Sequence, residues 1–493
     1  MAGKGLDGTV QDAKDVDEAF YAIETQADTG ETTNVDEHGL LRRIDFTLMP
    51  LMFGCYFLQY SDKTLINYAA VMGLIEDTNM PDNSFSHLAI AFYCSFLVFE
   101  PVQAFCFQRF PIAKWLGGNV ICWGVVLCMN CVCKSYAPLV VLRVLLGVFE
   151  SATAPGLNLM TTMWYKRSEQ AMRTGYWYQG TSIGPAISSL IAYGFVHWAA
   201  ADPDAKFKPW QTLFLLYGLV TIVVGMFVLV FLPDNPIKSR FTHDEKIVIV
   251  ERIRENQTGI ENKHFKWPQF KETLADPKTW LLSLIVISTN VPNGAVSSFS
   301  SIIIENFGYD QYQTLLLNLP GAAVAFVSVL LGTWWAGRYN GRGIAIIALV
   351  IPTLLGGALM AWLPQDNKAG LLVGNYLTNT VGSTLPLIYS WIGANYSGHT
   401  KKVTMNAIVL MSFCVGNVIG PETFQAKDAP QYIPAKITIV AVLGVAIVLT
   451  LALDTLLIRD NKARARDGIV DMPANYEFMD LTDKENRNFR YLL

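Results

Sequence analysis

The stretch Phe57-Leu-Gln-Tyr-Ser-Asp-Lys-Thr-Leu-Ile-Asn67 places two opposite charges side by side at the end of a long apolar segment. Asp62 and Lys63 are the only charged residues between Phe46 and Asn67. An ionisable side chain at the centre of a membrane helix costs about 2.5–3.5 kcal/mol, and such residues usually face a protein-lined cavity on an ion or substrate pathway. The stretch allows two interpretations: a self-neutralising pair at a helix end, or a proton site beside an anchor for an anion.

Composition identifies the chain as a polytopic membrane protein. Of its 493 residues, 52% are hydrophobic and only 16% are charged, against about 25% charged in an ordinary soluble domain. The net charge is −4, and no basic domain indicates a nucleic-acid partner. Residues 1–44 are acidic and poor in apolar side chains, so we expect a disordered cytoplasmic tail. Cys128, Cys131 and Cys133 have no neighbouring His or carboxylate, so we expect no metal site and no cofactor.

Apolar runs of about 20 residues, long enough to cross a bilayer, recur along the chain. Six precede a polar interval and six follow it. The spans are 46–67, 86–107, 115–133, 138–162, 172–196, 210–232, 280–302, 314–336, 343–363, 370–392, 404–424 and 434–458. The sequence therefore predicts an all-α polytopic membrane protein with twelve transmembrane helices in two six-helix bundles. The predicted parts are an N-terminal bundle at 45–232, a central loop at 233–278, a C-terminal bundle at 279–458 and a tail at 459–493.

Lys and Arg are concentrated in alternate connections between the spans. One of these is the central loop, where Thr242 and Glu245 predict the capped start of a helix that runs to about Asn256. Because basic residues accumulate on the cytoplasmic side, we expect both termini and this loop in the cytoplasm. Two six-helix halves joined by a long cytoplasmic loop are typical of major facilitator transporters, whose halves rock around a site near the bilayer midplane.

Further charges lie inside the spans of the first bundle. Glu100 lies near the end of the second span. Arg143 and Glu150 lie on one face of the fourth, roughly 10 Å apart along the helix axis, with Gly147 between them. This spacing is too long for an ion pair but leaves a gap for a ligand or a neighbouring helix. Burial and a nearby cation have opposite effects on the proton affinity of a carboxylate. Asp62 and Glu150 are therefore candidates for proton exchange, with a permanently paired Glu150 as the alternative.

The second bundle carries neutral polar residues instead. Asn379 and Asn417 are candidate ligand contacts, although amides in membrane helices also serve to hold helices together. Pro292, Pro320 and Pro386 predict broken or kinked helices that free backbone carbonyls toward a cavity. We therefore expect charge handling in the first bundle and hydrogen-bond selection in the second.

Several motifs resemble the anion:cation symporter group of the major facilitator superfamily, and more closely the fungal allantoate permease family. They are Tyr60-Ser-Asp62-Lys63-Thr64, Phe99-Glu100-Pro101, Arg143-Val-Leu-Leu-Gly147-Val-Phe-Glu150, Phe231-Leu-Pro-Asp-Asn-Pro236, Asp276-Pro-Lys-Thr-Trp280, Asn395-Tyr-Ser-Gly-His-Thr-Lys401 and Gly416-Asn-Val-Ile-Gly420-Pro-Glu-Thr-Phe424. The resemblance covers most of the chain from Arg43 to about Arg459.

This resemblance implies residue roles. Asp62 and Glu150 match proton-coupling positions, and Glu100 is a third candidate for that role. Lys63 and Arg143 match contacts to the anionic group of the substrate. Tyr60 and Gln179 are similar in position to substrate contacts. Many relatives have Arg at the position of Lys63, and lysine is a point charge rather than a planar fork, so bidentate recognition of a carboxylate is not expected here.

The implied function is import of a small organic anion, such as an allantoate-, vitamin-, peptide- or sulfonate-like compound, by proton symport. The alternative is export of a drug or secondary metabolite by proton antiport, because Gly180-Thr-Ser-Ile-Gly184-Pro185 resembles an antiporter motif without its trailing glycines. No Ser-His-Asp set or phosphate-binding glycine loop is present, so we expect no enzyme activity. The resemblance further implies a monomer in the fungal plasma membrane, with the lipid bilayer, protons and the substrate as its partners.

Overall fold

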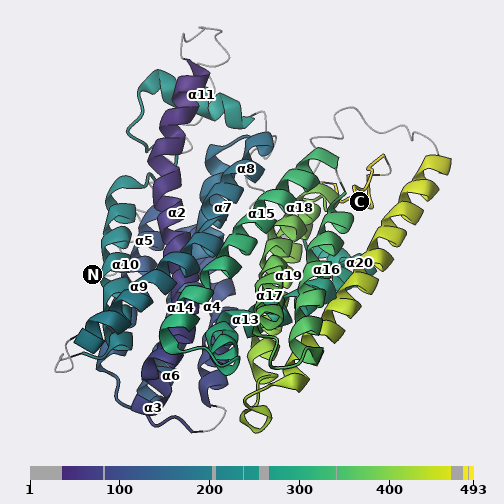
Figure 1. The fold of residues 1–493 in the computed structure, drawn as a ribbon. Helices are drawn as coiled ribbons and strands as arrows, with labels where there is room; N and C mark the ends of the chain where they lie inside the picture. Colours follow the sequence, from purple (N-terminus) through teal and green to yellow (C-terminus); the bar gives the residue numbers. More distant parts are fainter. Residues whose placement is uncertain are drawn as a thin grey trace.

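The long helices form two groups that stand side by side (Figure 1). The computed structural model describes residues 36–81, 84–201, 207–236, 238–254, 266–339, 341–467, 481–486 and 488–493. Every regular element in these ranges is helical. Residues 1–35 of the predicted acidic tail lie outside them. The first helix begins at Glu37, earlier than predicted, because the Asp36 carboxylate accepts a hydrogen bond from the backbone N–H of His38 (3.1 Å) and caps it.

The first half follows the first six predicted spans. Its long elements are α2 (Glu37–Ala69), α4 (Ser84–Arg109), α5 (Ile112–Met129), α6 (Tyr136–Glu150) with α7 (Thr153–Trp164), α8 (Arg167–Tyr178) with α9 (Gly180–Ala201), and α10 (Pro209–Phe231). The short elements η1 (Ala70–Leu74), α3 (Ile75–Asp77) and η2 (Asn130–Val132) end α2 and α5. Two spans are thus divided inside the membrane, one directly after Glu150 and one at Gln179.

The second half follows the other six. Its elements are α13 (Pro277–Asn306), α14 (Gln311–Leu317) with α15 (Leu319–Tyr339), α16 (Arg342–Trp362), α17 (Lys368–Thr378), η3 (Asn379–Ser383) and α18 (Thr384–Asn395), α19 (His399–Glu422), η4 (Ala426–Asp428) and α20 (Ile433–Asp467). Between the halves lie α11 (His243–Arg254) and α12 (Trp267–Ala275).

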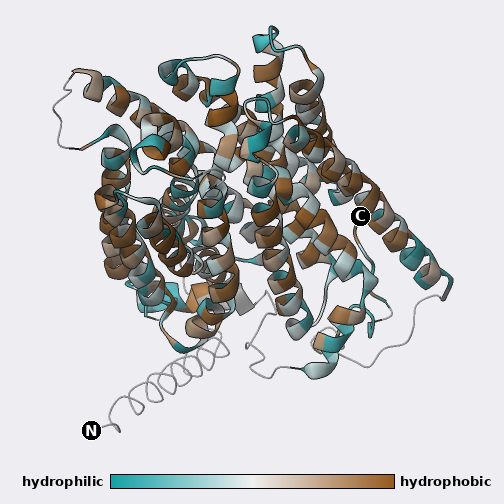
Figure 2. Cartoon of the chain, turned by 90° about the horizontal axis from the view of Figure 1, so that it is seen from below, coloured by the Kyte–Doolittle hydropathy of each residue, from teal (hydrophilic) through white to brown (hydrophobic). Residues whose placement is uncertain are grey.

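Ten helices in the described residues are long and apolar enough to cross a membrane. The remaining two predicted spans are α2, in which Gln59, Asp62 and Lys63 lower the mean hydropathy, and the rod that η3 divides into α17 and α18. Apolar residues colour much of the outer helices in Figure 2, as expected for helices in contact with lipid. The predicted all-α membrane fold is confirmed.

Two close contacts between helices of the first half depend on glycine. A Cβ atom on Gly147 of α6 would lie 2.4 Å from the backbone oxygen of Phe92 in α4. The gap predicted between Arg143 and Glu150 is therefore filled by a neighbouring helix. A Cβ on Gly184 of α9 would lie 2.8 Å from Ser61 Oγ in α2. Both contacts bring helix backbones together without a hydrophobic driving force.

Two of the three predicted proline breaks are present. Pro320 lies at the junction of α14 and α15, and Pro386 follows η3 at the start of α18. Pro292 instead lies within the continuous helix α13. A proline in a membrane helix is tolerated when neighbouring helices surround it, and Pro292 is buried.

One end of the bundle carries the start of α2, the end of α20, and α11 and α12; we call it the terminal face (Figure 1). In the first half, α11 is held there by ion pairs of Glu245 with Arg43 and of Arg252 with Glu169. The predicted capping box at its start is present, since Thr242 N–H donates to the Glu245 carboxylate (2.9 Å). Ionic contacts thus fix the central helix to the first half.

Residues 481–486 and 488–493 pack against the second half at the terminal face. The ammonium of Lys401, which is fully buried, contacts carboxylates of Glu272 and Asp483, each at 2.7 Å, and of Asp276 at 3.7 Å. The Tyr491 hydroxyl donates to Asp483 (2.7 Å), and burial raises the pKa of this hydroxyl, so it remains a donor. This segment joins α12, α13 and α19.

The opposite end of the bundle, which contains η1, α3 and α14, is the far face. Here the halves are joined by hydrogen bonds from Ser301 N to Asn67 Oδ1 (2.9 Å), Gln311 Nε2 to Val71 O (2.8 Å), Ser86 Oγ to Pro421 O (3.2 Å) and Ser189 Oγ to Leu315 O. Nearer the middle, the Tyr178 hydroxyl donates to Gly382 O (3.3 Å). Among the described residues, no hydrogen bond or ion pair joins the halves closer to the terminal face. The molecule is therefore closed at its far face.

Candidate functional site

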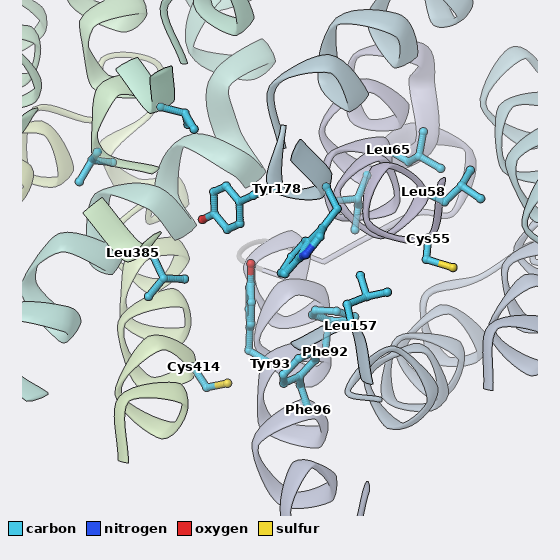
Figure 3. Close-up of a cluster of buried hydrophobic side chains, with 14 of the residues drawn as sticks. Cys55, Leu58, Leu65, Phe92, Tyr93, Phe96, Leu157, Tyr178, Leu385 and Cys414 are labelled. Atoms are coloured by element: carbon cyan, nitrogen blue, oxygen red, sulfur yellow. The ribbon is translucent and has the colours of Figure 1, made fainter. Parts of the chain in front are cut away.

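A cavity of about 90 Å³ lies between the two halves. The first half contributes residues of α2, α8 and α9, and the second half contributes residues of α13, α15, α17, η3, α18 and α19. Among its polar lining residues are Tyr60, Lys63, Asn67, Tyr178, Asn293, Ser300, Asn318, Asn375 and Asn379. Figure 3 shows Tyr178 of the first half directed toward the helix of the second half that carries Leu385. The wall is charged on one side and neutral but polar on the other.

Lys63 supplies the charge of this wall. Its ammonium lies 5.4 Å from the ring centroid of Phe413 in α19, and 6.0 and 5.7 Å from those of Tyr93 and Phe96 in α4. No ion pair within 4.0 Å includes Lys63 among the residues that the structure describes, although Glu150, Asp62 and Glu100 interact with it electrostatically. A cation that contacts aromatic rings and lacks a close carboxylate is available to an anionic ligand.

Asp62 is fully buried and does not line the cavity. Its Oδ2 accepts a hydrogen bond from the indole N–H of Trp123 in α5 (2.8 Å), and its Oδ1 lies 3.8 Å from a guanidinium nitrogen of Arg143 in α6. The neighbours Asp62 and Lys63 therefore point to different sides of α2. The acid faces the interior of the first half, and the base faces the second half.

Glu150 lies at the last position of α6, where the span is divided. Both of its carboxylate oxygens are buried and accept no hydrogen bond from the described residues. Its backbone oxygen accepts a hydrogen bond from Gln59 Nε2 (3.0 Å), which ties it to α2 one turn before Asp62. The Glu150 and Asp62 side chains lie within hydrogen-bonding reach of each other, and Lys63 and Arg143 interact electrostatically with the Glu150 carboxylate. An acid without donors in a dry interior is well suited to hold a proton.

Glu100 also lies inside the first half, at 7% exposure beside Pro101 in α4. Its Oε1 has no hydrogen-bond partner among the described residues, and Lys63 interacts with it electrostatically. Lys63 is thus the common neighbour of all three buried acids. The three acids and two cations predicted from sequence form one connected group.

The remaining predicted residues divide into two sets. Tyr60 and Asn379 line the cavity. Arg143, Gln179 and Asn417 do not, because Arg143 faces Asp62 and the Asn417 amide accepts a hydrogen bond from Asn293 (3.1 Å). Gln179 is buried at the break between α8 and α9. These positions hold in the conformation that is closed at the far face.

Sequence reasoning did not select Trp123, Tyr178 or Asn67. Trp123 lies in an apolar stretch, Tyr178 ends an amphipathic one, and Asn67 ends the stretch of Asp62 and Lys63, but no sequence pattern marks the three as contacts. Tyr178 and Asn67 form hydrogen bonds across the two halves, and Trp123 bonds to Asp62 across two helices. Only contacts between distant parts of the chain distinguish these residues from the other aromatic and amide residues of the spans.

The chain is similar to known transporters over nearly its whole length. A family model described as "Major Facilitator Superfamily" matches residues 52–421. Allantoate permease of Saccharomyces cerevisiae is 37% identical over 97% of this chain and 90% of the permease. "Thiamine pathway transporter THI73" of the same yeast is 37% identical over 97% of this chain and 91% of that protein.

A solved structure with the same fold is that of a bacterial homolog to the human lysosomal transporter Spinster, in an inward-facing and unoccupied conformation. It has a TM-score of 0.61 and 16% sequence identity, and the match covers 82% of this chain and 95% of that one. At this identity the likeness shows the fold alone.

Proposed function

Because the chain belongs to the major facilitator superfamily, we propose that it imports a small organic anion together with protons. The family and the relatives named above are transporters and not enzymes. The observation that supports an anionic substrate is the ammonium of Lys63, which lines a cavity between the two halves without a close carboxylate partner. A small anion in this cavity would touch both halves at once.

The proposed orientation places the terminal face in the cytoplasm, as the Lys and Arg distribution predicts. The closed far face then faces outside, and the described conformation corresponds to release of substrate into the cell. Rocking of the two halves around the cavity would open the far face and close the terminal face. We further propose that the protein is a monomer in the plasma membrane, a location that imaging of a fluorescent fusion beside a plasma-membrane dye tests.

Asp62, Glu150 and Glu100 are the proposed proton-coupling residues. Lys63 is the proposed contact to the anionic group, with Arg143 as the second cation, and Tyr60, Gln179, Asn379 and Asn417 as polar contacts during the cycle. An anion near Lys63 competes with the buried acids for its positive charge, so a bound anion favours proton uptake by those acids. One proton with a monoanion moves no net charge, so a pH gradient drives uptake by about 1.4 kcal/mol per pH unit.

The substrate class follows the relatives: allantoate-like, vitamin-like, peptide-like or sulfonate-like anions. The test uses the full chain in proteoliposomes and a panel of radiolabelled probes: allantoate, nicotinate, a dipeptide and taurine. Each is offered at two external pH values. We expect at least one probe to accumulate more at the acidic value. Equal accumulation of every transported probe at both values would contradict proton symport.

Asp62→Asn removes a carboxylate and keeps its size. We expect it to abolish accumulation driven by a pH gradient while exchange of pre-loaded probe continues. Asp454→Asn is the matched control, because Asp454 is a half-buried carboxylate of α20 that does not line the cavity. Unchanged pH-driven accumulation in Asp62→Asn would exclude the proposed role of this residue.

The same assay decides between import and export. Export by antiport predicts that an acidic exterior drives pre-loaded substrate out of the vesicles, because protons enter as the substrate leaves. It also predicts that cells lacking the protein retain more of a toxic compound.

The motif that suggests antiport has a packing explanation here. A Cβ atom on Gly180 would lie 2.7 Å from the backbone nitrogen of Phe57, so both glycines of the motif serve the contact of α9 with α2. No contact of the motif favours export.

A further inference from the structure

Trp123 forms a contact with the charged group that the sequence patterns do not indicate. It lies in α5, is fully buried, and donates its indole N–H to Asp62 Oδ2 at 2.8 Å. An indole N–H is a donor only, so the bond requires an accepting oxygen on Asp62. Asp62 thus has a fixed neutral donor on one oxygen and the guanidinium of Arg143 beside the other.

The helix that carries Trp123 has little freedom to move. The next residue, Gly124, packs directly on α10, where a Cβ atom would lie 2.8 Å from Ile222 N and 2.9 Å from Gly218 O. Because backbone meets backbone here, α5 and α10 approach as closely as two helices can. The indole is therefore held in place by a rigid contact on the neighbouring side of α5. It can set the direction of the Asp62 carboxylate.

Glu150 differs from Asp62 in this respect. Its two oxygens are equally buried, yet they accept no hydrogen bond from the residues that the structure describes. The same charged neighbours, Lys63 and Arg143, act on it electrostatically. Asp62 thus has the hydrogen bond from Trp123 and the Arg143 guanidinium at 3.8 Å, whereas the neighbour of the Glu150 side chain is the Asp62 side chain itself. A hydrogen bond to the charged form of a carboxylate favours that form.

The other charged groups around Asp62 are few. From α6 they are Arg143 and Glu150, and on its own helix Lys63. Helices α9 and α10 also pack against α2. Neither contains Asp, Glu, Lys or Arg, and His197 of α9 lies at its far-face end. The charges of α8 lie in its first seven residues, where Arg173 pairs with Asp45, and those of α13 lie at its two ends, where Lys278 pairs with Asp460. Trp123 is the contact of Asp62 with α5.

We propose that Trp123 is a positioning residue that orients the Asp62 carboxylate toward Arg143. This inference rests on the proposed proton coupling. With the indole N–H present, the Asp62 carboxylate faces Arg143 and keeps its guanidinium away from the cavity. Lys63 is then the cation left for the substrate.

The test measures proton binding directly and needs no substrate. The full chain in liposomes is titrated with acid, and the infrared band of protonated carboxyl groups is recorded. The part of the band that disappears in Asp62→Asn belongs to Asp62. Trp123→Phe keeps an aromatic ring but removes the N–H, and we expect the midpoint of the Asp62 band to move to higher pH by about one unit. In the double variant, the Asp62 band is expected to be absent.

Trp210→Phe is the matched control. Trp210 is equally buried and donates its N–H to Asp77 at the same distance of 2.8 Å, but at the far face and outside the charged group. Its loss has a comparable structural cost and should leave the Asp62 midpoint unchanged. If Trp123→Phe does not fold, Trp123→Met removes the same N–H with a side chain that adapts to irregular spaces.

The outcomes separate the two proposals. An unchanged midpoint in the Trp123 variants, or an equal shift in Trp210→Phe, would overturn the positioning role and leave proton symport standing. Absence of any band that Asp62→Asn removes would instead contradict Asp62 as a proton site. A shift in the Trp123 variants alone supports the inference.

Discussion

Arg143 is a buried and Lys63 a half-buried cation of the first half, and their surroundings separate their roles. Arg143 is 4% exposed and lies beside Asp62, whereas Lys63 contacts aromatic rings and lines the cavity. Lysine is a compact charge with rotatable donors, and arginine is a planar fork. A single mobile charge can accompany an anion as the halves rock, because it does not require one fixed orientation of the ligand.

At the residue scale, Lys63→Met tests this role. A hydrogen bond to a charged group contributes about 1.5–3 kcal/mol, so we expect uptake of the transported probe to fall by roughly 10- to 100-fold in kcat/KM. Lys436→Met is the control, since Lys436 is a buried lysine of α20 that contacts Phe307 outside the cavity. A loss of similar size in both variants would point to a general requirement for buried lysines.

At the scale of elements, two contacts determine how the helices are held. One is the contact of α9 with α2, which places Lys63 opposite the second half. The other is the ionic group around Lys401, which joins α12 and α13 to residues 481–486. The contact of α9 with α2 depends on glycine, which has no side chain. The Lys401 group depends on ion pairs among the buried side chains of Lys401, Asp276 and Asp483.

The α9 contact is tested by Gly184→Ala. The added Cβ would lie 2.8 Å from Ser61 Oγ and 3.0 Å from Phe57 O, and such overpacking costs about 1–3 kcal/mol. We expect a lower Tm in detergent. Gly194→Ala on the same helix meets no heavy atom within 4 Å and should leave Tm unchanged or slightly higher. Equal Tm values for the two variants would contradict the close approach of α9 to α2.

The Lys401 group is tested by Lys401→Met. Removing Lys401 leaves the buried carboxylate of Asp483 without its cation, while Asp276 keeps Lys484 at 3.2 Å, and the loss of a buried partner costs about 3–5 kcal/mol. We expect a large fall in Tm and faster proteolysis of the segment 481–493. Lys208→Met breaks the ion pair with Asp77, in which the lysine side chain is 57% exposed, and such a pair contributes about 0–1 kcal/mol. A comparable fall in Tm in Lys401→Met and Lys208→Met would show that burial does not determine how much an ion pair contributes to stability.

At the scale of the whole molecule, the far-face hydrogen bonds hold the halves together on one side of the cavity. Their partners come from α2, η1, α4 and α9 in the first half and from α13, α14 and α19 in the second. Alternating access requires these contacts to break and others to form at the terminal face.

Cross-linking tests this movement. In a background without the eight native cysteines, we expect Asn67→Cys with Ser301→Cys to react with a short bifunctional thiol reagent and to stop uptake. Arg43→Cys with Lys278→Cys, at the terminal face of opposite halves, should cross-link poorly in the same state. Full uptake after complete reaction of the far-face pair would show that the far face does not open during transport.

The sequence alone predicted the all-α membrane fold and which acids and bases lie within the spans. These properties depend on local composition, because a run of apolar residues must form a helix in lipid and a charge within it is costly. It also predicted the Thr242–Glu245 cap, which needs only neighbouring residues. It did not predict the continuous helix through Pro292, because surrounding helices decide whether a proline breaks its helix.

The tertiary structure alone decided which charges belong together. Asp62 and Lys63 are neighbours in sequence but face different sides of α2. Trp123 of α5 and Arg143 of α6 both contact Asp62. The direction of a side chain and its partners depend on how helices cross, and spacing along one helix carries no information about its neighbours. For this reason, the sequence identified the charged residues, and helix packing assigned the base to the cavity and the acid to the interior.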